Sequence, residues 1–259
     1  MSENVSKTLA EARWLKLKNL LRERGILRVE ELADELGVSL ATVRRDLAEL
    51  ETAGDLRRIH GGAMAPEHRA EEPLFDDKTA MAAPEKQRIA EAALKLIGPR
   101  DIVYLDGGST VLALARLLAP LTKLTVVTNS LRVAQILGSG GPRMILTGGE
   151  CRPISQTLVG PLTRAVLEQM NLDIAFMGTI GVSAEQGMTT TDPAEAFTKE
   201  QAMARATRAV LLADSSKFGQ KSFVRFGAVE RLSAVISDKQ LPSAERKALQ
   251  RAGIETILV

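Results

Sequence analysis

The sequence predicts an α/β protein in two parts: a small helical domain, followed by a larger domain built on a mostly parallel sheet. Two observations predict this division. The first 65 residues carry three apolar patterns with helical spacing, separated by short turns. From about Asp101 onward, short apolar runs alternate with amphipathic stretches. That alternation is typical of a mostly parallel sheet covered by helices on both faces.

Composition narrows the class of protein. The chain has 259 residues, of which 45% are hydrophobic and 25% charged, as expected for one large or two smaller globular domains. The first residues contain no apolar segment of the secretory kind, and no stretch is apolar enough to span a membrane. We therefore expect a cytoplasmic protein without a membrane partner. The single cysteine excludes an intrachain disulfide and a cysteine-based zinc cluster, so we expect no metal and no cofactor.

The N-terminal part is predicted to form three helices. Their apolar positions fall within 14–21, 29–36 and 40–50, and Ser39 is a good N-cap for the third. The glycines expected to end them are Gly25, Gly37 and Gly54. The second and third helices, separated by the letters GVS, form a helix-turn-helix unit. The stretch DLRRIHGGAM that follows suits a two-stranded wing.

The exposed side of the third helix indicates what this unit binds. Its first turns offer Ser39, Thr42, Arg44 and Arg45, whereas its acids come later. A recognition helix inserts its N-terminal end into the major groove of duplex DNA, where arginine suits guanine edges or phosphates. Arg57, Arg58 and His60 on the wing are then placed to contact the DNA backbone.

A plainer interpretation of the same residues remains open. The first 65 residues hold 11 basic and 11 acidic side chains, so their net charge is zero. The overall formal charge of +2 does not decide for or against nucleic acid. A helical domain with a solvated charged face, or a dimerisation module, has a similar pattern.

The stretch 31–63, ELADELGVSLATVRRDLAELETAGDLRRIHGGA, resembles the winged helix-turn-helix of the DeoR family of bacterial transcription regulators. The third helix and the wing match the family in order and spacing. The resemblance implies that Ser39, Thr42, Arg44 and Arg45 read or position the DNA. Ile59 departs from the pattern, because such wings more often carry a polar residue there.

A linker is expected between the two parts. The stretch 66–83 is rich in charge, alanine and proline, and its periodicity is weak. We interpret it as a hinge, partly helical at best. Pro84 suits the first turn of a helix that runs to about Ile97. The expected domains are therefore 1–65, the linker 66–83, and an α/β domain over 84–259.

Seven apolar runs predict the strands of the second domain: IVYL, LTVV, RMILT, DIAFMG, AVLLAD, AVISD and TILV. Ligands of such sheets bind at the carboxyl ends of the strands. Glycines there let the backbone approach a ligand, and helix N-termini attract anions. The residues at these ends that we expect to bind an anionic ligand are Asp106, Gly107, Gly108, Ser109, Thr110, Thr128, Asn129, Gly148, Gly149, Arg152, Gly178 and Lys217.

No single loop among these decides the function. The letters DGGST lack the ending of a P-loop, and GTIG falls short of a dinucleotide fingerprint. Each loop alone is also what a tight turn requires. Their convergence on one predicted sheet edge is the stronger argument. Cys151 is interpreted as a bystander, because neither histidine lies near it in the sequence.

The resemblance continues through this domain. The motifs YLDGGST, TVVTNS, LTGGE, DIAFMGTIGV, GMTTTDPAEAFTKEQAM and VLLADSSKFG follow the C-terminal sensor domain of DeoR regulators in order. That domain is similar in fold to ribose-5-phosphate isomerase and the coenzyme A transferases. The resemblance implies a phosphorylated sugar or related metabolite as effector, with Asp192 and Glu195 where the pocket closes. Gly107 stands where the family often has serine.

Three functions are weighed. The first, which we favour, is a metabolite-responsive repressor of a carbohydrate operon, binding double-stranded operator DNA as a dimer or tetramer; ligand-dependent activation is its variant. The second is a sugar-phosphate enzyme, for which acids and Lys217 supply the residue types. Fusion to a DNA reader argues against catalysis, because turnover destroys the signal, so no catalytic residue is assigned. The third is a structural or protein-binding module. The acids considered for the second are Asp106, Asp192, Glu195 and Asp214.

Overall fold

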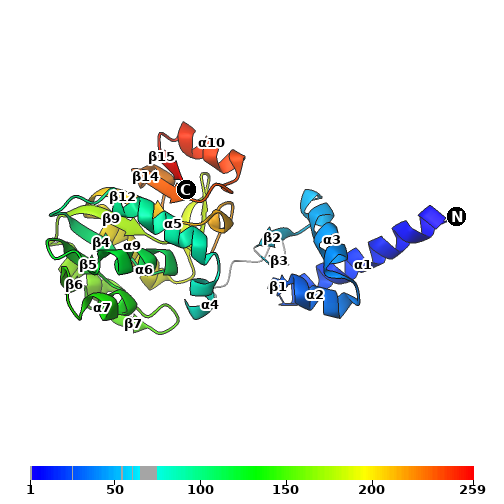
Figure 1. The fold of residues 1–259 in the computed structure, drawn as a ribbon, viewed down its shortest axis with the longest axis horizontal. Helices are drawn as coiled ribbons and strands as arrows, with labels where there is room; N and C mark the ends of the chain where they lie inside the picture. The colour runs from blue at the N-terminus through cyan, green and yellow to red at the C-terminus, as the bar shows by residue number, and fades with distance from the viewer. Residues whose placement is uncertain (1, 25, 54, 60, 65–74) are drawn as a thin grey trace. The chain divides into compact units, whose positions relative to one another are not determined.

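The computed structural model describes residues 2–24, 26–53, 55–59, 61–64 and 75–259 (Figure 1). The chain forms two compact units, Met1–Arg69 and Ala70–Val259, here called the winged unit and the sheet unit. The expected domain boundaries at 65 and 84 remain predictions. The part of the expected linker at 66–74, together with Ala65, lies outside the described residues. Its last part contains helix α4 (Phe75–Ala80), which packs against the sheet unit.

The described residues of the winged unit form three helices and a small antiparallel sheet. The sheet has the order β1-β3-β2, so the wing has one strand more than the sequence predicts. Gly37 ends the second helix in the left-handed conformation, with φ 66°, and Ser39 caps the third, as expected. Gly25 and Gly54 lie outside the described residues. The elements are α1 (Ser2–Arg24), β1 (Ile26–Arg28), α2 (Val29–Leu36), α3 (Leu40–Thr52), β2 (Arg57–Ile59) and β3 (Gly62–Met64).

The core of the winged unit comes from the expected apolar faces. Leu17 of α1, Leu32 of α2 and Leu47 of α3 are almost fully buried in one cluster. Leu27 and Ala63 join it from the sheet. Each helix therefore buries the face that its spacing predicts, which leaves the other face of α3 in solvent.

The sheet unit contains a seven-stranded sheet with the order β15-β14-β12-β9-β4-β5-β6. All six pairings between neighbours are parallel. Each of the seven apolar runs predicted as a strand lies in it, so the expected α/β fold is confirmed. The strands are β4 (Ile102–Leu105), β5 (Thr125–Thr128), β6 (Arg143–Leu146), β9 (Leu172–Met177), β12 (Ala206–Leu212), β14 (Ala234–Ser237) and β15 (Glu255–Leu258).

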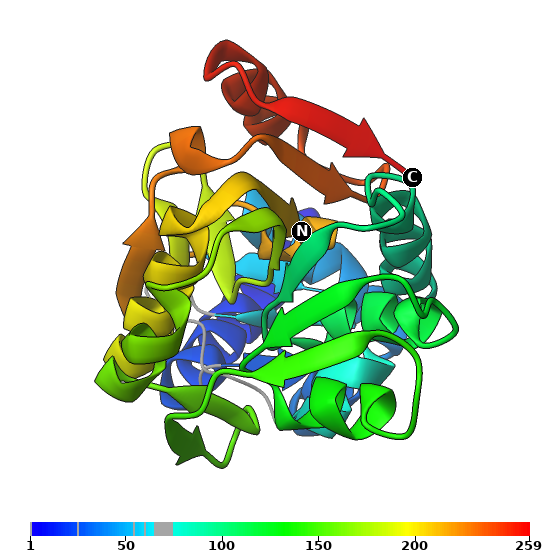
Figure 2. The same cartoon turned by 90° about the vertical axis from the view of Figure 1, so that its left-hand side faces the viewer.

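Helices cover both faces of this sheet (Figures 1 and 2). One core cluster packs α5 (Ala83–Leu94), α6 (Ser109–Leu118) and α7 (Leu131–Leu137) against one face. A second cluster packs residues of α8 (Arg164–Leu167), α9 (Pro193–Ala204) and α10 (Ser243–Arg251) against the other. Two buried faces explain why the strands are continuously apolar rather than alternating.

Smaller elements lie beside this sheet that the sequence does not predict. A hairpin of β7 (Glu150–Arg152) and β8 (Thr157–Val159) follows the third strand. A second antiparallel sheet has the order β10-β11-β13, from Gly181–Ser183, Gly187–Thr190 and Val224–Gly227. Within the described residues, every helix is too short or too polar to cross a membrane.

Candidate functional site

The N-terminal turns of α3 present the side chains expected to read DNA. Arg44 and Arg45 are exposed. Ser39 accepts a hydrogen bond from the Thr42 backbone N–H at 3.2 Å, and the two hydroxyl oxygens lie 2.9 Å apart. The two hydroxyls therefore fix the first turn of α3, while the two arginines extend into solvent.

Asp46 fixes the rotation of α3. It is only 2% exposed and accepts hydrogen bonds from Arg13 Nη2 and Trp14 Nε1 of α1, both at 2.9 Å. Burial alone raises the pKa of a carboxyl, but here the hydrogen bonds and charge of Arg13 outweigh burial and lower the pKa of Asp46. Because Asp46 points inward, its neighbours Arg44 and Arg45 point outward.

The wing is tied to the end of the same helix. The backbone N–H of Arg58 donates to Glu51 Oε1 at 3.0 Å, and the Arg58 side chain is exposed. Arg57 lies on β2, but its side chain is outside the described part of the chain, as is the whole of His60. The late acids of α3 thus include one that positions the wing.

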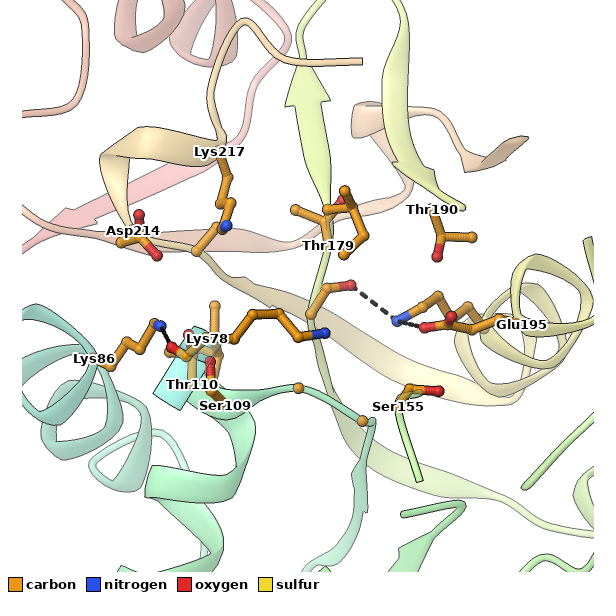
Figure 3. A pocket seen from close by; sticks show the side chains of 17 residues that line it. Lys78, Lys86, Ser109, Thr110, Ser155, Thr179, Thr190, Glu195, Asp214 and Lys217 are labelled. Carbon is orange, nitrogen blue, oxygen red and sulfur yellow. Dashed lines mark hydrogen bonds and ion pairs between the residues drawn. The ribbon is translucent and has the colours of Figure 1, made fainter. Parts of the chain in front are cut away.

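The sheet unit contains a pocket of about 600 Å³, part of it open to solvent, at the carboxyl ends of the central strands (Figure 3). Seven of the expected ligand-binding residues line it: Gly107, Gly108, Ser109, Thr110, Gly178, Glu195 and Lys217. Ten lining residues were not among those expected to bind the ligand: Lys78, Lys86, Ser155, Thr179, Ile180, Thr190, Lys199, Leu212, Ala213 and Asp214.

The N-terminus of α6 opens into the pocket. Strand β4 ends at Leu105, and Gly108 is the N-cap of α6 with φ 127°, without a side chain that could cap the helix. The first amides of a helix have no intrahelical acceptor and attract anions. Gly107 is required by close packing, because a Cβ there would lie 2.4 Å from Thr157 Cγ2. Glycine at 107 therefore matches the neighbouring threonine.

Lysines from three elements surround this opening. Lys78 lies on α4, Lys86 on α5 and Lys217 on the short helix η2 (Ser215–Lys217). Figure 3 shows the side chains of Lys78 and Lys217 directed into the pocket. Asp214, the N-cap of η2, accepts hydrogen bonds from Ser216 and supplies a negative charge nearby. Positive charge beside open helix amides suits a phosphate group.

An ion-pair network forms the pocket floor. Lys199 Nζ contacts Asp106 Oδ2 and lies 3.4 Å from Glu195 Oε1 and 3.2 Å from the Gly178 carbonyl oxygen. Burial alone lowers the pKa of a lysine, but the charges of Asp106 and Glu195 outweigh burial and raise the pKa of Lys199. Asp106 is 1% exposed and does not line the pocket. It supports Lys199 and also accepts from the Gly178 N–H at 2.9 Å.

Two buried hydroxyls near the floor have no hydrogen-bond partner among the described residues. Thr190 Oγ1 is fully buried and lines the pocket (Figure 3). Tyr104 OH lies on β4, and burial together with the charges of Asp106 and Glu195 raises the pKa of Tyr104 well above its ordinary value. A buried hydroxyl without a partner is costly, so Thr190 is a candidate to bond a ligand.

Thr128 and Asn129 hold the backbone instead of lining the pocket. Thr128 Oγ1 donates to the Leu105 carbonyl oxygen at 2.7 Å. Asn129 Nδ2 donates to the Leu158 carbonyl oxygen at 3.1 Å. Both residues are fully buried. They join the end of β5 to β4 and to β8.

Arg152 lies one layer behind the pocket. Its guanidinium donates to Ser155 Oγ at 3.1 Å and lies 3.5 Å from Glu195 Oε2 and 3.6 Å from Asp192 Oδ2. Asp192 also caps α9, and neither it nor Arg152 lines the pocket. Arg152 thus positions two residues, Ser155 and Glu195, that do line it.

The glycines Gly148 and Gly149 precede the β7–β8 hairpin and do not line the pocket. Gly149 has φ 121°, and a Cβ there would lie 2.9 Å from the Val159 carbonyl oxygen. Both glycines have a positive φ, which the turn before the hairpin requires. Cys151 follows on β7 with an exposed thiol. The described residues contain no cluster of His, Cys, Asp and Glu side chains that could hold a metal ion.

Two signals in the sequence point to the missed lysines. Lys199 stands four residues after Glu195, a spacing that places both on one face of a helix. Lys86 stands three and four residues before Ile89 and Ala90, so it falls on the apolar face of α5. A charged residue on the apolar face of a helix becomes buried, and buried charged residues are almost always paired.

A winged helix-turn-helix followed by an α/β unit with an anion-suited pocket defines a DNA-binding regulator with a sensor domain. Two family models match the chain: a DeoR-like helix-turn-helix domain over residues 13–69 and a DeoR C-terminal sensor domain over residues 81–239. The chain belongs to the DeoR family of transcriptional regulators.

Its relatives cover nearly its whole length. It is 40% identical to a lactose phosphotransferase system repressor of Streptococcus mutans, over 89% of this chain and 92% of the relative. It is 36% identical to the HTH-type transcriptional regulator GlpR of Haloferax volcanii, over 88% and 90%. A solved D-ribose-5-phosphate isomerase in complex with phospho-erythronic acid matches 52% of this chain and 54% of its own, with 18% identity and a TM-score of 0.41.

Proposed function

We propose that the chain represses a carbohydrate operon and releases its operator when a phosphorylated sugar, or a related phosphorylated metabolite, binds the pocket. The observation that carries this proposal is the uncapped N-terminus of α6, opening beside lysines from three separate elements. A phosphate group can take the helix amides together with the ammonium groups of Lys78 and Lys217. The names of relatives support the carbohydrate role: one is a lactose phosphotransferase system repressor, another a putative aga operon repressor from Escherichia coli O157:H7.

The rest of the pocket suits the hydroxyl groups of such a ligand. Glu195 can accept hydrogen bonds and Lys199 can donate them. The Thr190 hydroxyl can do either. The ligand-binding role of Asp106 becomes indirect in this proposal, because its carboxylate is buried against Lys199. Asp192 and Arg152 likewise act through the residues they hold.

Sensing is favoured over catalysis by the same network. A general base must be able to take a proton near the reacting carbon. The carboxylates nearest the pocket floor, Asp106 and Glu195, are paired with Lys199. We therefore propose that the ligand is bound and released unchanged. Operator binding by a dimer or tetramer is part of the proposal, because operators with symmetric half-sites are read by paired recognition helices.

The test begins by selecting duplexes from a random DNA library with the full chain. Mobility shifts on the selected duplex are then measured with a panel of sugar phosphates and their dephosphorylated forms. We expect one phosphorylated compound to weaken the complex and its dephosphorylated form to have no effect. A ligand that strengthens the protein–DNA complex would indicate ligand-dependent activation instead of ligand-induced release. Absence of any selected duplex would remove the DNA-binding role, and sustained conversion of the ligand, followed by NMR, would establish an enzyme instead.

A further inference from the structure

Helix α4 contributes Lys78 to the lining of the pocket, although the sequence places this helix in a linker. Phe75, its first residue, is 4% exposed and packs in the core of the sheet unit. The guanidinium of Arg132 on α7 lies 4.1 Å from the centre of the Phe75 ring. Lys78, one turn further on, lines the pocket. The start of α4 is thus anchored in the core.

The end of α4 is held by Lys86. The Lys86 ammonium donates to the Met81 carbonyl oxygen at 2.6 Å and to the Lys78 carbonyl oxygen (Figure 3). The last carbonyls of a helix lack partners within the helix and carry partial negative charge, so an ammonium there is favourable. Lys86 is 5% exposed. Burying a lysine this far from water is costly unless its ammonium is hydrogen-bonded, and here the two carbonyl oxygens supply those bonds.

The turn between the two helices is also held by Lys86, through its backbone. Ala82 adopts φ 50° and ψ 35°, a left-handed conformation that residues with a Cβ rarely take. Its carbonyl oxygen accepts from the Lys86 backbone N–H at 3.0 Å. Lys86 therefore secures the turn by its backbone and α4 by its side chain.

We propose that α4 is part of the effector site: Lys86 is a positioning residue that fixes α4, and Lys78 is the cation that α4 contributes to the phosphate group of the ligand. The proposal rests on the function proposed above. Figure 3 shows the Lys78 side chain extending into the pocket, which Lys217 enters from η2 and which the N-terminus of α6 also lines. A dianion between them neutralises charge from α4, α6 and η2 together.

This arrangement couples ligand binding to the position of α4. Helix α4 is the first described element of the sheet unit along the chain, so the ligand contacts the N-terminal described segment of this unit. A ligand shifts an equilibrium only through contacts that differ between two states. The phosphate can contact Lys78 only while α4 is packed against the sheet unit, so phosphate binding and the packing of α4 stabilise each other.

The test uses inorganic phosphate as the probe and the full-length chain. Isothermal titration gives the phosphate affinity of the wild type, Lys78→Gln, Lys217→Gln and Lys123→Gln; Lys123 is an exposed lysine outside the pocket that matches the charge change. We expect about tenfold weaker binding for Lys78→Gln and for Lys217→Gln, and no change for Lys123→Gln. Hydrogen exchange should show that phosphate protects the amides of Phe75–Ala80 in the wild type, and that Lys78→Gln loses this protection.

Lys86 is tested by a pair of variants. Lys86→Met should speed exchange in Phe75–Ala80 and weaken phosphate binding, and Lys86→Arg, which keeps the charge and the donors, should restore much of both. Lys78→Gln carries the test if Lys86→Met does not fold. Equal phosphate affinity of Lys78→Gln and the wild type, with Lys217→Gln weakened, overturns the role of α4 and leaves the anion site intact. No phosphate binding by the wild type, or none lost in Lys217→Gln, overturns the anion site itself.

Discussion

Lys199 on α9 pairs with Asp106 at the end of β4, although 93 residues separate them in the chain. The pair lies under the pocket, and Asp106 acts on the ligand space through Lys199 and the Gly178 N–H, which both line it. A carboxylate at the end of a central strand is the natural candidate for a ligand contact, yet here it sets the position of a cation. Substitution of Asp106 therefore tests stability as well as binding.

Asp106→Asn should destabilise the sheet unit by about 3–5 kcal/mol, because it leaves the buried Lys199 ammonium without its main counter-charge. Urea unfolding of the full chain measures this free energy. Lys199→Met combined with Asp106→Asn should recover part of it, since no buried charge is then left unpaired. Glu168→Gln, which breaks the exposed pair with Arg164, is the control and should cost less than about 1 kcal/mol. Similar losses for Asp106→Asn and Glu168→Gln would contradict the buried pair.

Gly107→Ala should destabilise the sheet unit by about 1–3 kcal/mol and weaken ligand binding, because its methyl group would collide with Thr157 Cγ2. Thr157→Ser removes that methyl and keeps the hydroxyl, which lies 2.7 Å from Ser155 Oγ. The double variant should therefore be more stable than Gly107→Ala alone. Thermal unfolding of the four proteins checks this, and a double variant worse than both single ones would exclude the collision as the cause.

Sulfate binding should weaken as the pH rises from 7 to 9. Burial is the main cause that lowers the pKa of Lys86, to about 8. The positive charges of Lys217 and Lys78 lower this pKa further, whereas the negative charges of Asp214 and Glu85 raise it. The free protein thus loses the Lys86 proton in this range, and an anion binds the protonated form better. The affinity should fall by up to about tenfold one pH unit above that pKa.

Sulfate keeps its charge over this range, so the slope belongs to the protein. Titration calorimetry at several pH values gives the profile, and Lys86→Met should flatten it. A profile that stays as steep in Lys86→Met would assign the titration to another group.

Arg44→Ala and Arg45→Ala should weaken operator binding, because both side chains extend from the first turns of α3 into solvent. A contact to a base edge should cost about 1–3 kcal/mol and relax specificity at one position. A phosphate contact should weaken all sequences alike and reduce the salt dependence. Mobility shifts at several salt concentrations separate the two. Glu49→Gln, at an exposed acid later in α3, is the control, and unchanged affinity in the double arginine variant would contradict this placement of the helix.

Asp46→Asn should destabilise the winged unit by about 1.5–3 kcal/mol, because Asp46 accepts charged hydrogen bonds from Arg13. The pKa of Asp46 is lowered in the folded state, so its contribution is present above the ordinary carboxyl pKa of 3.8 and is lost as the pH falls through the lower folded pKa. Urea unfolding between pH 2 and 6 should show this loss in the wild type and not in Asp46→Asn. Parallel profiles would exclude Asp46 as the titrating group.

The fold could be predicted from the sequence where hydrophobic periodicity is strong. All seven strands of the main sheet were recognisable as apolar runs, because both faces of that sheet are covered. The hairpin 150–159 and the sheet built from β10, β11 and β13 were missed. Their strands are three or four residues long and polar in part, so their pairing depends on contacts distant in the sequence.

The pocket was predicted mainly where its residues follow the ends of parallel strands. The loop 107–110, Gly178 and Lys217 follow strand ends, and the rule for parallel sheets places such residues together. Thr128 and Asn129 also follow a strand end, but their side chains turn to neighbouring carbonyl groups. Lys78 could not be found by this rule, because α4 reaches the pocket through tertiary packing of Phe75.

Cys151 allows the wild-type chain to be labelled with a fluorescent dye at one site. It is the single cysteine of the sequence, and its thiol is exposed on β7. The next residue, Arg152, contacts Ser155 and Glu195, which line the pocket. A thiol-reactive dye therefore attaches at one defined place without any substitution. It stands one residue from a guanidinium whose partners face the ligand, so changes in its emission can follow occupancy of the pocket in real time.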